Sequence, residues 1–195
     1  MTFARMECLM LLGCTAVVFG QVKKTTPPTS VTEIFDRSVD GPERATLALA
    51  EKMPESLYSF VPTQGQFKGV RTFAQLATHI TVANYQMGAA LLREKVPIEP
   101  GPHDNGPDSL RSKADVVKFL RESFIYLHKA IATVNEHNLL EVVELPGGGR
   151  VPRLSVVTAA ISHPWDIYGQ MIEYLRLNGI VRSSDIKKPQ TFSSS

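Results

Sequence analysis

The stretch of sequence that decides the fold is the last apolar segment, which reads His163-Pro164-Trp165-Asp166-Ile167-Tyr168-Gly169-Gln170-Met171-Ile172-Glu173-Tyr174-Leu175-Arg176-Leu177-Asn178-Gly179-Ile180-Val181. It completes a helical pattern that begins near Arg153 and reaches Asn178. Gly179 stands where a left-handed C-cap is expected, and Ile180 is its apolar companion. We therefore expect one long helix over residues 153–178.

Three further helical patterns precede this segment. The first spans residues 31–53 and contains Gly41-Pro42. Because proline removes a backbone donor and clashes with the preceding turn, we expect a break or sharp kink there. The second pattern begins at Thr72, where Thr72 and Gln75 fit a capping box.

The third pattern begins near Ser112, with Asp115 as the reciprocal cap three residues later. Its apolar residues recur in steps of three and four, as on one buried helical face; they are Val117, Leu120, Phe124, Leu127, Ile131 and Val134. A long proline-rich loop over residues 96–110 allows a crossover between the second and third helices. Residues 141–152 indicate a small hairpin or irregular loop before the last helix. The prediction is an all-α fold, a four-helix bundle.

Composition narrows the class of protein. A length of 195 residues suggests one domain, and 43% hydrophobic with 21% charged residues is ordinary for a globular chain. A formal net charge of +2 and the lack of any basic cluster argue against a nucleic-acid partner.

The N-terminus is typical of an export signal. Arg5 precedes an apolar run from Cys8 to Phe19, and small or medium residues stand before a cleavage at Gln21. This run is too short for a stable membrane span, which needs roughly 20 apolar residues. An alternative is a lipoprotein anchored at Cys14, because residues 11–14 resemble a lipoprotein box.

The resulting domain prediction has four parts. Residues 1–20 are a signal peptide, 21–30 a flexible leader, 31–184 the bundle, and 185–195 a disordered tail. The protein would be exported, to a periplasmic or extracellular location. Cys8 and Cys14 are its only cysteines, so the mature chain would contain neither a disulfide nor a thiol ligand.

Two further stretches carry a family resemblance. They are Met53-Pro54-Glu55-Ser56-Leu57-Tyr58-Ser59-Phe60 and Arg71-Thr72-Phe73-Ala74-Gln75-Leu76-Ala77-Thr78-His79-Ile80. Together with Tyr168 to Val181, they resemble the DinB-like family, in particular its exported members, over residues 31–184. The resemblance implies a four-helix bundle that binds a divalent metal, commonly zinc or nickel, through three histidines. One histidine lies on the second helix, and two lie four residues apart on the fourth.

One of these three ligands is missing here. His79 matches the ligand on the second helix and His163 the first ligand on the fourth, but Ile167 occupies the position of the third. Isoleucine has no donor atom, and zinc normally has at least three protein ligands. Asp166 is a candidate replacement, because residues i and i+3 share a helical face. Pro164 alters the aim of both side chains.

Two functions follow. The first is an exported DinB-like domain of unknown activity with a degenerate metal site and no cofactor, acting as a small-molecule binding or interaction module. The alternative is a thiol transferase or hydrolase that uses Zn or Ni bound by His79, His163 and Asp166. The resemblance also makes a homodimer a candidate assembly. His128, beside the apolar stripe of the third helix, is interpreted as a boundary residue.

Overall fold

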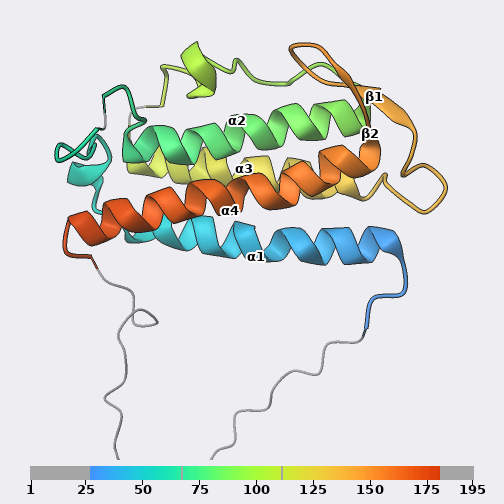
Figure 1. The fold of residues 1–195 in the computed structure, drawn as a ribbon, viewed down its shortest axis with the longest axis horizontal. Helices are drawn as coiled ribbons and strands as arrows, with labels where there is room; N and C mark the ends of the chain where they lie inside the picture. Colours follow the sequence, from blue (N-terminus) through green and yellow to red (C-terminus); the bar gives the residue numbers. More distant parts are fainter. Residues whose placement is uncertain (1–26, 67, 111, 181–195) are drawn as a thin grey trace, which may run out of the picture.

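The structure, a computed structural model, describes residues 27–66, 68–110 and 112–180. Within these residues four α-helices form a bundle (Figure 1): α1 (Val31–Lys52), α2 (Phe73–Leu92), α3 (Lys113–Ile131) and α4 (Arg153–Leu177). The short elements are η1 (Glu55–Leu57), η2 (Pro102–Asp104) and the hairpin strands β1 (Val142–Glu144) and β2 (Arg150–Pro152). The all-α four-helix prediction is confirmed, and so is the hairpin before the last helix.

Each helix of the bundle packs against two others. α2 packs against α3 and α4, and α1 packs against the same two helices. α2 and α3 run in the same direction, because their connection returns along the whole length of the bundle (Figure 1). This connection is the crossover that the proline-rich loop allowed. α4 runs antiparallel to α2.

The ends of the helices follow the predicted capping chemistry. The Thr72 hydroxyl accepts from the Gln75 N–H, and the Gln75 side chain accepts from the Thr72 N–H. Ser112 and Asp115 form the same reciprocal pair at the start of α3. At the end of α4, Gly179 has φ +71° and the Ile180 N–H donates to the Leu175 carbonyl at 2.9 Å, which completes a Schellman motif.

The expected break at Gly41-Pro42 is wrong, because α1 is continuous through both residues. Pro42 is buried, and its carbonyl accepts from the Thr46 hydroxyl at 2.8 Å. A Cβ atom on Gly41 would stand 3.3 Å from Cζ2 of Trp165 on α4. Tertiary packing of this turn therefore offsets the cost of the one backbone hydrogen bond that proline cannot form. α4 likewise continues through the buried Pro164.

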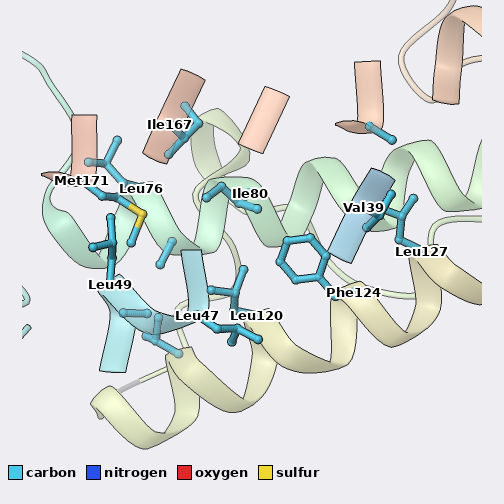
Figure 2. Close-up of a cluster of buried hydrophobic side chains, with 14 of the residues drawn as sticks. Val39, Leu47, Leu49, Leu76, Ile80, Leu120, Phe124, Leu127, Ile167 and Met171 are labelled. Atoms are coloured by element: carbon cyan, nitrogen blue, oxygen red, sulfur yellow. The ribbon is translucent and has the colours of Figure 1, made fainter. Parts of the chain in front are cut away.

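The core contains large apolar side chains from all four helices (Figure 2). Phe73, Ile80, Phe124 and Met171 are completely buried. No helix in the described part of the chain is long and apolar enough to cross a bilayer. The predicted signal peptide and tail, and most of the leader, lie outside the described residues.

One buried cation joins three helix ends. Arg153, the first residue of α4, is only 5% exposed. Its guanidinium donates to the Leu91 carbonyl at 3.0 Å and to the Thr133 carbonyl and hydroxyl at 3.2 and 2.7 Å. Leu91 lies in the last turn of α2, where carbonyls have no intrahelical partner, and Thr133 follows the end of α3. Arg153 therefore satisfies acceptors at both ends.

We expect Arg153→Ala to lower the free energy of unfolding by about 3 kcal/mol, because it leaves buried carbonyls without a donor. Urea unfolding followed by circular dichroism measures the change. Arg150→Ala is the matched control, since Arg150 is exposed on β2. Equal, small losses in both variants would contradict the role of Arg153 at the helix ends.

Candidate functional site

The structure brings His79 and His163 together between α2 and α4. Their ring centroids lie 5.1 Å apart with an interplanar angle of 78°. The antiparallel packing of the two helices places the middle of α4 beside the first half of α2. The two histidines that the sequence singled out therefore form a real pair.

His79 is oriented by the loop that crosses α2. Its Nδ1 lies 3.1 Å from the Asp104 carbonyl oxygen, an acceptor, so this nitrogen carries the proton. The Asp104 carboxylate accepts from the Gln86 amide at 3.1 Å. This tautomer leaves Nε2 of His79 with its lone pair free for a ligand.

The turn that presents Asp104 is tightly built. His103 and Asp104 have φ of +58° and +56°, a left-handed conformation that non-glycine residues rarely adopt. A Cβ atom on Gly101 would stand 1.9 Å from the Gly106 carbonyl oxygen, so only glycine fits there. Arg71 donates to the His103 carbonyl at 2.9 Å and fixes the turn to the start of α2. Backbone strain of this kind is retained where the surrounding structure imposes it, often at binding sites.

His163 is the unsatisfied member of the pair. Its Nε2 is buried and has no hydrogen-bond partner among the described residues. Burial lowers the pKa of His163, and the neighbouring His79 and the Arg71 charge lower it further, while Asp166 opposes them. Burial also lowers the pKa of His79, against the hydrogen bond to Asp104. Both imidazoles are therefore neutral at pH 7.

The third ligand position contributes no donor. Ile167 is 3% exposed and belongs to the hydrophobic core, where Figure 2 shows it among the buried side chains. Asp166 is exposed. In the described ranges, His79, His163 and Asp166 are not a group whose donor atoms all lie within 4.8 Å of one another. Two imidazoles alone do not fit a zinc site, which needs three protein ligands.

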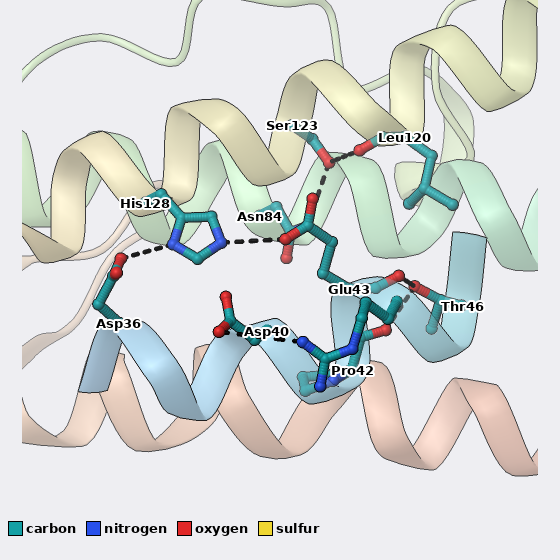
Figure 3. Close-up of polar contacts among 10 residues, drawn as sticks. Asp36, Asp40, Pro42, Glu43, Thr46, Asn84, Leu120, Ser123 and His128 are labelled. Carbon is teal, nitrogen blue, oxygen red and sulfur yellow. Dashed lines mark hydrogen bonds and ion pairs between the residues drawn. The ribbon is translucent and has the colours of Figure 1, made fainter. Parts of the chain in front are cut away.

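A second cluster was missed at the sequence level. Asp40, Glu43 and His128 are the one group of three in the described part of the chain whose possible ligand atoms lie within 4.8 Å of one another. His128 Nε2 lies 3.1 Å from Glu43 Oε2, and Nδ1 lies 2.5 Å from Asp36 Oδ1 (Figure 3). The available signal was the spacing of residues 36, 40 and 43, which share one face of a continuous helix.

This arrangement defines the class: a four-helix bundle with a crossover and a histidine pair between its second and fourth helices. The family model of the DinB superfamily matches residues 40–171. The chain therefore belongs to the DinB superfamily.

A crystal structure of a DinB-like protein from Bacillus cereus is similar in fold. Its TM-score is 0.58 at 18% sequence identity, and the alignment covers 75% of this chain and 92% of that one. No curated protein matches the sequence.

The lowered histidine pKa values predict a pH effect on stability. Below the ordinary value of 6.5 the unfolded chain takes up protons at His79 and His163 before the folded chain does, so their burial destabilises the fold as pH falls. We expect the double variant His79→Gln/His163→Gln to lose less stability than the parent between about pH 7 and about pH 5.5. Urea unfolding at the two pH values measures this. Equal losses in parent and variant would contradict the lowered pKa values.

Proposed function

We propose that this chain is an exported DinB-like domain with a degenerate metal site, in which the histidine pair binds a small molecule or a partner. The observation that carries the proposal is Ile167, which fills the third ligand position with a buried apolar side chain. The pair keeps two neutral imidazoles and offers too few donors for a tight zinc site.

A cavity supports a small-molecule role. It has a volume of about 330 Å³ and lies between α2, α4 and the hairpin. Ser155 and Ala159 line it, and they precede His163 at steps of four residues on α4. Gln86 lines it from α2 and also bonds Asp104, the residue that orients His79. The cavity therefore lies on the same face of α4 as His163, one turn away from it, although neither histidine is among its lining residues.

The lining indicates what kind of molecule would fit. The other lining residues are apolar: Met87, Leu145, Pro146, Val151 and Val156. The nearest histidine along α4 is His163, four residues after Ala159, and its Nε2 is buried and unpartnered within the described residues. A compound with an apolar body and one hydrogen-bonding group would match both features, because buried polar atoms favour a partner.

Export is part of the proposal, and it rests on the sequence alone. The support is the pattern around residues 1–20, with a charged start, a short apolar run and small residues before Gln21. N-terminal sequencing of the mature chain distinguishes cleavage before Gln21 from lipidation at Cys14.

The alternative is a divalent-metal-dependent thiol transferase or hydrolase that uses His79, His163 and Asp166. One observation favours it: the Asp166 charge acts on His163 and raises its pKa, against the stronger effect of burial. The Asp166 carboxylate therefore lies near enough to affect the pKa of the His163 imidazole.

We expect Ile167→His to add about one equivalent of tightly bound zinc or nickel relative to the parent chain, because it completes a three-histidine ligand set. Metal content of untagged protein, measured by mass spectrometry after exposure to excess metal and dialysis, gives the number. Ile161→His is the matched control, since it adds a histidine to the same helix outside the pair.

His163→Ala provides the converse test. Under the proposal this change leaves the metal content of the parent chain unaltered. Loss of one equivalent from the parent would overturn the proposal and favour the metalloenzyme. Circular dichroism of each variant confirms that the bundle has folded.

A further inference from the structure

We propose that Asp40, Glu43 and His128 form a zinc-type divalent cation site in the groove between α1 and α3. This site is separate from the His79/His163 pair, which lies between α2 and α4. It does not depend on the function proposed for that pair.

The donor atoms are close to the spacing that a small ion requires. Tetrahedral zinc with bonds near 2 Å holds its ligand atoms about 3.3 Å apart. His128 Nε2 and Glu43 Oε2 are already 3.1 Å apart, and the Asp40 carboxylate lies within 4.8 Å of both. A change of rotamer at Asp40 would bring the third donor to the ion.

Asp36 prepares His128 for this role. It accepts from Nδ1 of the imidazole at 2.5 Å, which directs Nε2 toward Glu43. Metal-bound histidines usually donate their other ring N–H to a carboxylate, which fixes the tautomer and strengthens the ligand. The same carboxylate–histidine relay is present here, with Nε2 facing the two proposed oxygen ligands.

Exposure is graded across the site. The side chains of Glu43 and His128 are 23% and 24% exposed, whereas Asp40 is 45% exposed. Among the described residues Asp40 forms one long ion pair, 3.9 Å from Arg44, which is itself 75% exposed. The half-exposed Asp40 leaves an entry path for the ion and a side on which water can complete its coordination.

An independent observation on α2 points to the same place. Asn84 is completely buried, and its Oδ1 has no hydrogen-bond partner in the described part of the chain. Its amide nitrogen donates to the Ser123 hydroxyl at 3.1 Å, and in the view of Figure 3 the Asn84 side chain lies behind the Glu43 carboxylate. A buried amide oxygen without a donor is costly, and an ion with its bound water would supply one.

The donor set selects the class of ion. Two carboxylates with one imidazole suit zinc and similar transition metals, whereas magnesium and calcium prefer oxygen ligands alone. An ion would replace the Nε2 proton that His128 donates to Glu43 across 3.1 Å. Binding would therefore exchange one positive charge for two in a site lined by three carboxylates.

The test is titration of the untagged full chain with Zn²⁺ alone, after chelator treatment, followed by calorimetry and by the histidine ring signals in NMR. We expect one equivalent to bind and to perturb the His128 ring but not the His163 ring. His128→Ala and Glu43→Gln should each abolish the stoichiometric step, and the nearly isosteric glutamine covers the case in which alanine impairs folding. Asp36→Asn should weaken binding by about 10- to 100-fold, because it removes the orienting carboxylate.

Glu51→Gln is the matched control, since Glu51 is an exposed carboxylate on the same helix that pairs with Arg121. It should leave binding unchanged. No zinc uptake by the parent chain would overturn the proposal. Uptake that survives Glu43→Gln, or that perturbs His163 in place of His128, would also overturn it.

Discussion

The connection from α2 to α3 is the constraint on which the rest of the structure depends. α2 has 20 residues and is therefore about 30 Å long. Because α3 runs parallel to it, the chain must return over that whole distance before α3 can begin. On the way it forms the strained turn at His103 and Asp104, whose carbonyl sets the tautomer of His79. The topology of the bundle thus orients one member of the histidine pair.

The bundle holds histidines in two opposite electrostatic settings. Between α2 and α4, burial and a neighbouring cation keep His79 and His163 neutral. Between α1 and α3, burial alone would lower the pKa of His128, but the hydrogen bonds to Asp36 and Glu43 outweigh it and raise the pKa. The residue type is the same in both grooves, and the neighbours decide its charge. One groove suits a neutral ligand and the other suits a cation.

The sequence predicted the parts of the fold that depend on local chemistry. Both capping boxes and the Gly179 C-cap were predictable, because each motif lies within a few residues. The continuous α1 was not, because the packing of Pro42 and Gly41 against the core is a tertiary effect. That error concealed the second cluster. A helix break between Asp40 and Glu43 would have placed these two residues on different faces, whereas the continuous α1 places them on one face. The pairing of His79 with His163 came from family resemblance, and the turn over His79 had no local signal.

Trp165 gives the molecule a built-in reporter. It is the only tryptophan of the chain and is 42% exposed. Its backbone lies two residues from His163, while its ring reaches α1 at Gly41, the residue next to Asp40. A single chromophore thus lies close in sequence to the histidine pair and in space to the residue before Pro42 on α1. Its fluorescence would report changes near His163 or near Gly41 without an added label.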